Sequence, residues 1–444
     1  MDETPTIFAL SSAPGRAGVA VVRVSGPRAG PALDALVSPR PQDRVAALRR
    51  VHSPDTGEIV DHALVLWLAG PRTETGEDMA ELHLHGGPAI VKAVLAALSA
   101  LPGCRLAEPG EFARRAFENG KIDLAQVEGL ADLIDAETEA QRRQAVAQMA
   151  GALSALYEGW RRELIEACAL TEAAIDFSDE GDVAADALAM ARARVADLRD
   201  AIAAHLDDNN RGEILREGFR VVLAGAPNVG KSSLLNALAR REAAIVSEEA
   251  GTTRDVIEVR LDLGGYPVIV SDTAGIREPQ GSIEREGIRR TLAHAREADL
   301  ILWLSDASAP EAAAPPPELA ARGDKFLLAI ANKIDVPAAR PAPGTLAVSA
   351  KTGAGIDALA RGIGDIARDR IGACASPAIT HARYRQQLQA CLEALQAFLS
   401  GVASDIELRA EELRQAAHAL GRITGRVDVE DVLGEIFGRF CVGK

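Results

Sequence analysis

The sequence contains no apolar run that approaches the about 20 residues needed to cross a bilayer. Its start, Met-Asp-Glu-Thr-Pro, also lacks the basic stretch followed by an apolar stretch that marks a secretory signal. Membrane-spanning and secreted classes are therefore not indicated, and we expect a cytoplasmic protein without a membrane partner.

Cysteine is scarce, and its spacing excludes two common uses. The five cysteines are odd in number and scattered: Cys104, Cys168, Cys374, Cys391 and Cys441. No C-x-x-C pair suggests zinc or a redox dithiol, so reduced thiols without a disulfide framework are expected.

Positive charge is in deficit, with 49 Lys and Arg residues against 64 Asp and Glu residues and a formal net charge of −15. This balance argues against a protein that coats nucleic acid by neutralising its phosphates. If RNA is a substrate, its contacts are confined to patches such as Arg114-Arg115 or Arg142-Arg143, or a partner supplies them. The alternative for each arginine pair is a solvated helix face.

The length of 444 residues predicts about three domains. Residues 1–118 contain strand-like runs separated by Pro and Gly turns, which indicates an α+β domain. Residues 119–216 and 373–444 have the periodicity of amphipathic helices and flank an α/β segment at 217–372. Because each helical block needs a partner for its apolar stripe, we expect the blocks to pack together. The fold class is thus multidomain α/β and α, with 217–372 inserted into a discontinuous helical domain.

A phosphate-binding pattern, G-x-x-x-x-G-K-[ST], spans Gly225–Ser232 and follows the strand-like run Phe219–Ala224. Glycines allow backbone amides to turn toward phosphate oxygens, Lys231 adds a positive charge, and the Ser232 hydroxyl can reach Mg²⁺. The pattern predicts a nucleoside triphosphate site in a Ras-like domain with a mostly parallel sheet.

Three further stations identify the nucleotide. Asp272–Gly275 follows a strand-like run, and its aspartate can act on Mg²⁺ through water. Asn332–Asp335 and Ser349–Lys351 close two more such runs. The Asp335 carboxylate can accept both the ring NH and the exocyclic amine of guanine, which predicts GTP as the substrate. The alternative for Asn332–Asp335 is a polar turn without a ligand.

The loop Ser247–Thr253 is the expected first switch, since the Thr253 hydroxyl can complete the Mg²⁺ shell and sense the γ-phosphate. Strand-like runs at Val256–Leu263 and Tyr266–Ser271, joined by Gly264-Gly265, predict a hairpin. The full set of candidate GTP contacts is Asn228, Val229, Gly230, Lys231, Ser232, Ser233, Ser247, Glu248, Glu249, Ala250, Gly251, Thr252, Thr253, Asp272, Thr273, Ala274, Gly275, Asn332, Lys333, Asp335, Ser349, Ala350 and Lys351.

The water-orienting glutamine that Ras-type GTPases place after the glycine of Asp272–Gly275 is absent, because Ile276 stands there. The hydrolytic group must lie elsewhere. Local candidates are Asn228 and Glu284, with Arg254 as a further catalytic candidate. On its own, Glu284 is also typical of a solvated first-turn helix residue.

Two other patterns carry weaker signals. His83 and His85 alternate on a strand and so face one side, but no third ligand lies nearby, which favours structural histidines over a metal site. The last four residues, Cys441–Lys444, do not make a prenylation box, because Gly443 is not aliphatic. Residue chemistry alone favours a frayed tail with a free thiol.

Three motifs outside the nucleotide stations support a resemblance: Pro109-Gly110-Glu111-Phe112 with Arg115-Ala116-Phe117, Lys121-Ile122-Asp123-Leu124-Ala125-Gln126, and Phe440-Cys441-Val442-Gly443-Lys444. With the four stations they resemble, essentially end to end, the tRNA modification GTPase family called MnmE or TrmE. The resemblance implies a folate-binding and homodimerising domain at 1–118, helical parts at 119–216 and 373–444, and a G domain at 217–372.

By this resemblance, the protein forms a heterotetramer with an FAD-carrying flavoprotein, MnmG. Together they install a 5-carboxymethylaminomethyl or aminomethyl group on the wobble uridine of certain tRNAs, using a tetrahydrofolate one-carbon donor. Matching positions for folate are Arg23, Glu81, Lys121 and Lys444, where basic groups suit the carboxylates of its glutamate tail. Cys441 matches a tail cysteine and is a catalytic candidate.

The resemblance also implies a hydrolytic device in which K⁺ binds beside the phosphates when two G domains pair. Matching K⁺ positions are Asn228, Ser247, Glu249 and Thr252, and Glu284 matches a water-orienting glutamate. The competing hypothesis is a ribosome-assembly GTPase, an RNA-binding checkpoint without modification chemistry. Against it stand the first domain and the absence of a recognisable basic appendage after the G domain.

Overall fold

The computed structural model describes residues 4–179, 181–241, 257–272, 298–309, 315, 326–372, 377–401, 406–427, 430–438 and 440–443, and the statements below concern these residues. The chain divides into two compact units. Unit 1 comprises Met1–Ala131 and Gly421–Lys444, and unit 2 comprises Asp132–Leu420. No helix in the described ranges is long and apolar enough to span a membrane.

Unit 1 contains a mostly antiparallel sheet in the order β3-β4-β5-β2-β1-β6. Its strands are β1 Thr6–Leu10, β2 Ala17–Ser25, β3 Ala47–His52, β4 Ile59–Leu68, β5 Met79–Gly86 and β6 Cys104–Leu106. Helices α1 (Ala29–Leu36) and α2 (Pro88–Ser99) bury one face, where alternate strand residues such as Val22, Val65 and Leu82 form the core. The α+β character expected of residues 1–118 is present in these strands and helices.

The C-terminal residues belong to unit 1. Helices α3 (Glu111–Glu118), α4 (Leu124–Ile134) and α15 (Glu430–Gly438) form a small apolar core of their own. In that core Phe437 and Phe440 pack with Ala113, Leu124 and Val127. Residues 421–444 therefore pack with the first domain, although helical periodicity alone places them in one block with 373–420.

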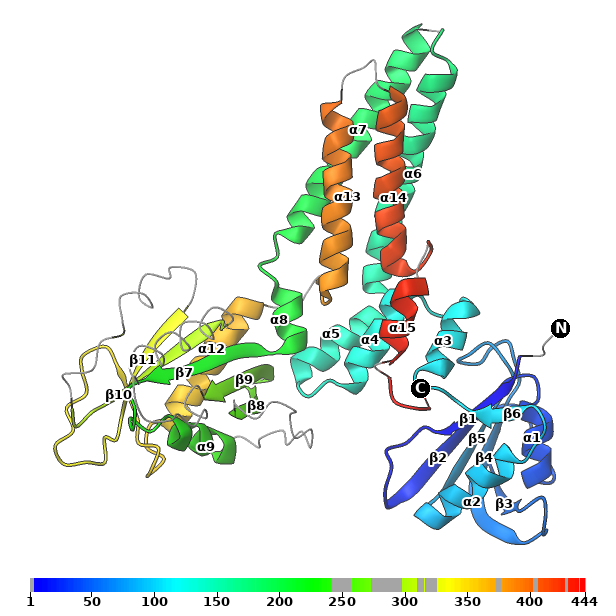
Figure 1. The fold of residues 1–444 in the computed structure, drawn as a ribbon, viewed down its shortest axis with the longest axis horizontal. Helices are drawn as coiled ribbons and strands as arrows, with labels where there is room; N and C mark the ends of the chain where they lie inside the picture. Colours follow the sequence, from blue (N-terminus) through cyan, green and yellow to red (C-terminus); the bar gives the residue numbers. More distant parts are fainter. Residues whose placement is uncertain are drawn as a thin grey trace, which may run out of the picture. The chain divides into compact units, whose positions relative to one another are not determined.

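Outside the inserted segment, unit 2 contains α5 (Glu139–Met149), α6 (Ala152–Asp176), α7 (Gly181–Leu206), α8 (Arg211–Glu217), α13 (Ala382–Ser400) and most of α14 (Ile406–Thr424). In Figure 1, α6, α7, α13 and α14 run side by side, and α7 contacts both α6 and α13. Tyr157 of α6 meets Tyr384 of α13 edge to face, with ring centroids 6.3 Å apart, within the range of about 4.5–7 Å that aromatic pairs prefer. The expected packing between the two helical blocks is thus confirmed within unit 2.

The inserted segment of unit 2 has a sheet in the order β12-β11-β10-β7-β9-β8, parallel except for β8. Its strands are β7 Phe219–Gly225, β8 Ile257–Leu263, β9 Tyr266–Asp272, β10 Leu300–Asp306, β11 Phe326–Asn332 and β12 Leu346–Ala347. Helices α9 (Lys231–Arg241) and α12 (Ile356–Ile371) share a core with one face of this sheet. The predicted β8–β9 hairpin and the predicted fold class are confirmed, while β10 was not foreseen.

The Asp132 carboxylate contacts residues at both points where the chain passes between the helices and the inserted segment. Asp132 accepts a hydrogen bond from Arg216 Nε at 2.8 Å, and its other oxygen lies 3.0 Å from His381 Nε2. Arg216 is in α8, just before β7, and His381 is the N-cap of α13. One acidic group therefore binds residues beside both crossings between the helices and the sheet.

Candidate nucleotide-binding site

The predicted nucleotide stations meet at one edge of the unit 2 sheet. Strands β7, β9, β10 and β11 run parallel and end there at Gly225, Asp272, Asp306 and Asn332. The central strand β7 has β9 on one side and β10 on the other. The order in which the chain adds strands to the sheet therefore reverses beside β7. Ligands of open α/β sheets bind at such a reversal, outside the carboxyl ends of the strands.

The loop between β7 and α9 has a backbone that few residue types permit. Gly225 and Gly230 have φ of +147° and +98°, and Asn228 has φ of +63°. A Cβ on Gly225 would lie 2.3 Å from the carbonyl oxygen of Leu304, so a side chain there would displace backbone. These left-handed conformations curl the loop as an anion-binding nest requires.

Lys231 lies inside this loop and is 8% exposed. Its ammonium donates to the carbonyl oxygens of Gly225 and Ala226, both at 3.0 Å. Burial lowers the pKa of this ammonium, and the nearby Asp272 carboxylate opposes that effect. The result is a positive charge held at the mouth of the loop, where it can attract phosphate.

Ser232 and Asp272 form the predicted magnesium pair. The Ser232 hydroxyl donates to Asp272 Oδ2 at 2.5 Å, and Asp272 is fully buried. A hydroxyl and a carboxylate are hard oxygen donors of the kind Mg²⁺ prefers, so these two residues fit that ion.

The Asn332–Asp335 station is attached to the phosphate loop itself. Asn332, 2% exposed, donates from Nδ2 to the carbonyl oxygen of Val229 at 2.8 Å and accepts from the amide of Ala350 at 3.1 Å. Lys333 donates to the carbonyl oxygen of Asn228 at 2.8 Å. Three stations far apart in sequence are therefore joined, which a polar turn without function does not require.

Asp335, the carboxylate predicted to bind guanine, is held by two neighbouring residues. Ser349 donates to Asp335 Oδ1 at 2.7 Å, and Lys351 Nζ lies 3.9 Å from Oδ2. The hydrogen bond from Ser349, aided by the charges of Lys351 and Lys333, holds the pKa of this carboxyl below its ordinary value. Asp335 is therefore ionised at neutral pH, as a group that accepts two donors from a base must be.

Unit 1 brings together two of the residues predicted to bind folate. Arg23 of β2 lies opposite Glu81 of β5 and donates to its Oε1 at 3.2 Å. The same guanidinium reaches Glu74 at 2.8 Å. Lys121 donates to the carbonyl oxygen of Pro71, in the loop that also carries Glu74. Glu74 was not foreseen, because nothing in the sequence marks its pairing with Arg23.

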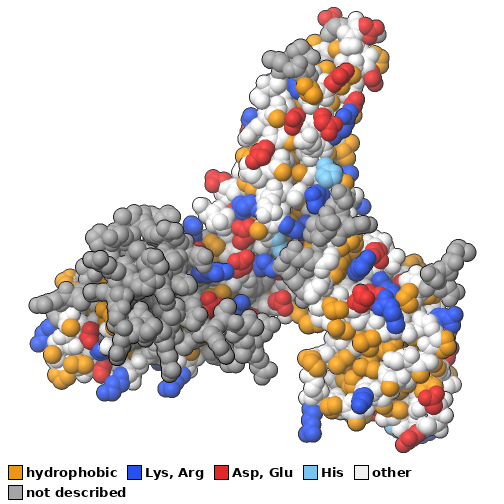
Figure 2. Space-filling model, in the orientation of Figure 1, with side chains coloured by type: hydrophobic (Ala, Val, Ile, Leu, Met, Phe, Trp, Pro, Cys, Tyr) orange, Lys and Arg blue, Asp and Glu red, His pale blue; other side chains and the backbone are white. Residues whose placement is uncertain are grey.

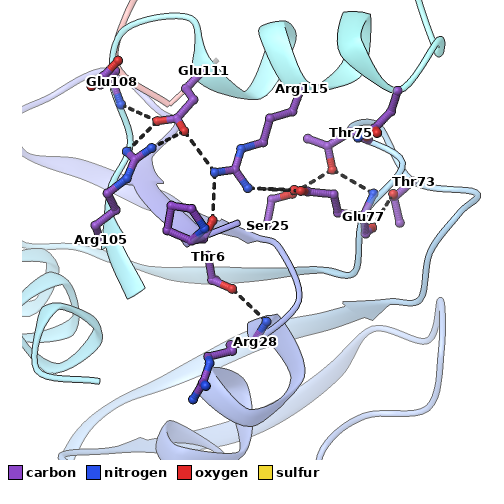
Figure 3. A network of polar contacts seen from close by, with 12 residues as sticks. Thr6, Ser25, Arg28, Thr73, Thr75, Glu77, Arg105, Glu108, Glu111 and Arg115 are labelled. Atoms are coloured by element: carbon purple, nitrogen blue, oxygen red, sulfur yellow. Dashed lines mark hydrogen bonds and ion pairs between the residues drawn. The ribbon is translucent and has the colours of Figure 1, made fainter. Parts of the chain in front are cut away.

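The Pro109–Phe112 motif and Arg115 build a buried polar network (Figure 3). Glu111 receives hydrogen bonds from Arg105 at 2.8 and 2.6 Å and from Arg115 at 3.0 Å. Arg115 also binds Glu77 at 3.1 Å, and Glu77 accepts from Ser25 at 2.7 Å. The network joins α3 to strands β2 and β6 and to the loop before β5.

The tail is held in place rather than frayed over the residues that the structure describes. Ser11 donates to the carbonyl oxygen of Gly443 at 2.8 Å, and Val442 forms an isolated bridge with Pro109. Gly443 has φ of +103°, and a Cβ there would lie 2.3 Å from the carbonyl oxygen of Leu10. Cys441, directly before these two anchored residues, is exposed and free, so its thiol is accessible.

Comparison with known proteins agrees with this arrangement. Residues 6–121 match the family described as GTP-binding protein TrmE N-terminus, and residues 124–441 match the MnmE helical domain. The tRNA modification GTPase MnmE of Methylorubrum populi is 55% identical over 441 residues, covering 99% of this chain and 98% of that protein. The protein of the same name from Parvibaculum lavamentivorans is 52% identical, covering 99% and 100%.

The chain belongs to the MnmE family. The family resemblance predicted from the motifs is confirmed, and with it the prediction of a GTP-hydrolysing enzyme. Among solved structures, the FeoB G-domain from Methanococcus jannaschii is 24% identical and covers 34% of this chain and 98% of that one, with a TM-score of 0.27.

His83 and His85, which the sequence suggests are structural histidines, both lie beside carboxylates of the protein. His83 Nε2 lies 3.3 Å from Glu81 Oε2, and His85 Nδ1 lies 2.7 Å from Asp61 Oδ1. Within the described ranges, no group of three His, Cys, Asp or Glu residues is placed to hold a metal ion. Four of the cysteines are seen, and all four are free.

Several predicted site residues lie outside the described residues: Ser247, Glu248, Glu249, Ala250, Gly251, Thr252, Thr253, Arg254, Thr273, Ala274, Gly275, Glu284 and Lys444. The expected first switch and most of the expected K⁺ ligands are among them, and Asn228 is the K⁺ position that is described. Their roles stay predictions.

Asp306 is a charged residue at this edge that motif reasoning missed. It ends β10 and pairs with Lys333 at 2.7 Å. The available signal was the apolar run Leu300–Leu304 followed by a polar pair, which has the same form as the strand endings before Asp272 and Asn332.

Proposed function

We propose that this chain is a K⁺-dependent GTPase that, with an MnmG-type flavoprotein, installs a 5-carboxymethylaminomethyl or aminomethyl group on the wobble uridine of certain tRNAs. A tetrahydrofolate derivative donates the one-carbon unit, and FAD is carried by the partner. The observation that carries the proposal is the direct attachment of the guanine-reading station to the phosphate loop through Asn332. Family membership along the whole chain supports the tRNA chemistry.

The nucleotide site would hold Mg²⁺ through Ser232 and Thr253, with Asp272 acting through water. The ion neutralises charge between the phosphates during transfer. Asn228, Ser247, Glu249 and Thr252 would bind K⁺, and Glu284 would orient the attacking water, with Arg254 a further catalytic candidate. Lys231 and the amides of the phosphate loop, already curled in this structure, would bind the phosphate oxygens.

The proposed folate site centres on Arg23, Glu81, Lys121 and Lys444. Arg23 supplies a guanidinium of the type that binds carboxylates in a bidentate manner. Its present partner Glu74 is 44% exposed, so a carboxylate from the glutamate tail of folate can replace it at little cost. The exposed thiol of Cys441 is proposed to act in the modification step.

The homodimer is proposed to form through the face of the unit 1 sheet opposite α1 and α2. Leu48, Leu64, His83 and Val21 lie in register across β3, β4, β5 and β2, in one row on this face. Leu48 is 68% exposed and Leu64 is 41% exposed. Figure 2 shows hydrophobic side chains gathered on the surface of unit 1. Such a patch on a soluble protein typically marks an interface.

We assign one role to each of the expected domains. Residues 1–118 bind folate and the second copy, 119–216 and 373–444 form the helical part with the tail, and 217–372 hydrolyse GTP. We propose that a homodimer and the flavoprotein form a heterotetramer in the cytoplasm. Hydrolysis would shift the population of paired G domains, and the helices would carry that change to the tRNA site.

The deciding experiment is mass spectrometry of tRNA nucleosides from cells that lack this protein. We expect the wobble-uridine modification to disappear and to return with the wild-type gene. A Cys441→Ser gene that fails to restore it, while its product hydrolyses GTP normally, supports a role for the thiol in the modification step. Unchanged nucleosides in the deletion would overturn the proposal and favour a ribosome-assembly GTPase.

A further inference from the structure

We propose that Asp306 is a positioning residue of the nucleotide site, which acts on the phosphate loop through Lys333. Asp306 belongs to none of the four motif stations. It lies at the end of β10, directly opposite Asn332 in the pairing of β10 with β11. Its position places a negative charge beside the Asn332–Asp335 station.

The two oxygens of Asp306 have separate partners. Oδ1 accepts from the amide of Ser308 at 2.9 Å and from its hydroxyl at 2.6 Å. Oδ2 binds the ammonium of Lys333 at 2.7 Å. The hydrogen bond from Lys333, followed by those from Ser308, lowers the pKa of Asp306 to about 2, so the carboxylate stays charged at neutral pH. Ser308 thus orients one oxygen and leaves the other directed at Lys333.

Lys333 passes this restraint to the phosphate loop. Its ammonium, fixed by Asp306, also donates to the carbonyl oxygen of Asn228 at 2.8 Å. Asn228 has φ of +63°, in the left-handed region that residues other than glycine adopt infrequently and that asparagine tolerates better than most. Lys333 itself has φ of +65°. The Lys333 side chain therefore connects two left-handed backbone positions, and Asp306 holds that side chain in place.

The restraint determines where the loop amides point. Lys333 holds the carbonyl of Asn228, and Asn332 holds the next carbonyl, that of Val229, at 2.8 Å. In a planar trans peptide the N–H points opposite to the C=O. With both carbonyls turned to the guanine-reading station, the amides of Val229 and Gly230 turn the other way, into the curl of the loop. Loss of the Asp306 restraint should therefore weaken phosphate binding.

The bland interpretation is a surface ion pair with no effect on the nucleotide. The side chains of Lys333 and Asp306 are 36% and 20% exposed, and exposed pairs contribute little. If the pair were of that kind, substitution of Asp306 would change neither the affinity for nucleotide nor the effect of a Lys333 substitution on that affinity. These two readouts separate the interpretations.

The test compares Asp306→Ala and Asp306→Asn with the wild-type full-length chain. Calorimetry gives Kd for GDP and GTP, and steady-state hydrolysis with saturating Mg²⁺ and K⁺ gives KM and kcat. We expect Asp306→Ala to raise both Kd values and KM by about tenfold, the scale of one charge-assisted hydrogen bond, with a smaller change in kcat. Asp306→Asn keeps an acceptor and should restore part of the affinity. Ser308→Ala, which leaves the ion pair intact, should change Kd by less than about twofold.

A double-mutant cycle with Lys333→Met tests whether Asp306 acts on the phosphate loop through Lys333. If Asp306 acts through Lys333, Asp306→Ala costs no further affinity in the Lys333→Met background. Full additivity, or an unchanged Kd in both Asp306 variants, would overturn the proposal. If Asp306→Ala does not fold, Asp306→Asn in the same cycle gives the answer. This proposal rests on the proposed function, because it requires guanine-nucleotide binding. A wild-type chain that binds neither GDP nor GTP would overturn the proposed function. Normal binding by the wild type together with unaffected variants would overturn this proposal alone.

Discussion

Gly212 lies directly against the carbonyl of Ile379, so close that a Cβ on Gly212 would come within 2.3 Å of that oxygen. Gly212 is in α8, which leads the chain into the nucleotide-binding sheet, and Ile379 lies on the segment that returns from it. Both residues are buried. The two crossings thus touch backbone to backbone, beside the Asp132 carboxylate that also binds both.

We expect Gly212→Ala to destabilise the protein by about 1–3 kcal/mol, because the added methyl group can be accommodated only if backbone shifts. Gly159→Ala is the matched control, since Gly159 is within the long helix α6 and its Cβ would meet nothing within 4 Å. The control should be neutral or up to about 1 kcal/mol more stable. Urea unfolding followed by circular dichroism measures both, and equal effects of the two substitutions would contradict the packing argument.

Asp335→Asn should change the preferred base. The Asp335 carboxylate is predicted to accept two donors of guanine. An asparagine offers one acceptor and one donor, which matches the N–H and carbonyl of xanthine. We expect Kd for GDP to rise at least about 100-fold and xanthosine diphosphate to bind in its place, as expected when buried polar groups mismatch. Calorimetry with both nucleotides checks this. Lys351→Ala, which removes only the 3.9 Å neighbour, should keep the preference for guanine.

The parts of the nucleotide site that sequence predicted are those with local signals. Gly225, Lys231 and Asn332 stand in fixed spacings directly after strand-like runs, and parallel strands bring such positions to one edge. The strand that ends at Asp306 has an equally apolar run, but no motif follows it, and it was overlooked. Its ion pair with Lys333 depends on the register of β10 and β11, which composition does not reveal.

The position of the C-terminal tail, residues 441–443, could not be predicted from the sequence either. Residue chemistry alone favours a frayed end with a free thiol. Ser11 nevertheless binds Gly443 across a sequence separation of 432 residues. The close approach of Gly443 to Leu10 requires a residue without a side chain at positive φ. Contacts of that range follow from the packing of Phe437 and Phe440, and helical periodicity does not indicate which unit receives them.

Glu111 should make the stability of unit 1 depend on pH. Burial alone would raise the pKa of this carboxyl, but hydrogen bonds from Arg105, the amide of Glu108 and Arg115 outweigh burial and lower it. A carboxyl with a lowered folded-state pKa contributes stability above its ordinary pKa of 4.5, and this contribution is lost as the pH falls through the folded-state value. Glu111→Gln should therefore weaken the unit at neutral pH and matter progressively less in acid.

Hydrogen exchange of peptides that cover β6 and α3, corrected for the intrinsic rate, measures this effect at each pH. We expect Glu111→Gln to lower the free energy of local opening by about 1–3 kcal/mol at pH 7. Glu118→Gln is the control in the same helix, because the Glu118 pair with Arg114 is exposed and such pairs contribute little. A difference between wild type and Glu111→Gln that stays constant from pH 7 to well below the ordinary carboxyl pKa would show that the charge of Glu111 is not its source.

Leu64→Glu should separate the proposed homodimer. Leu64 lies in the middle of the row shared by β3, β4 and β5, and a two-fold interface brings the same surface of both copies together. The substitution would then place two unpaired carboxylates in one apolar contact, raising the dimer Kd by at least about 100-fold. Sedimentation over a range of concentrations measures this. Leu106→Glu is the control, because Leu106 is an exposed leucine of the edge strand β6 outside the row. If both variants keep the wild-type association state, the copies meet through another surface, and the apolar row then requires a different partner.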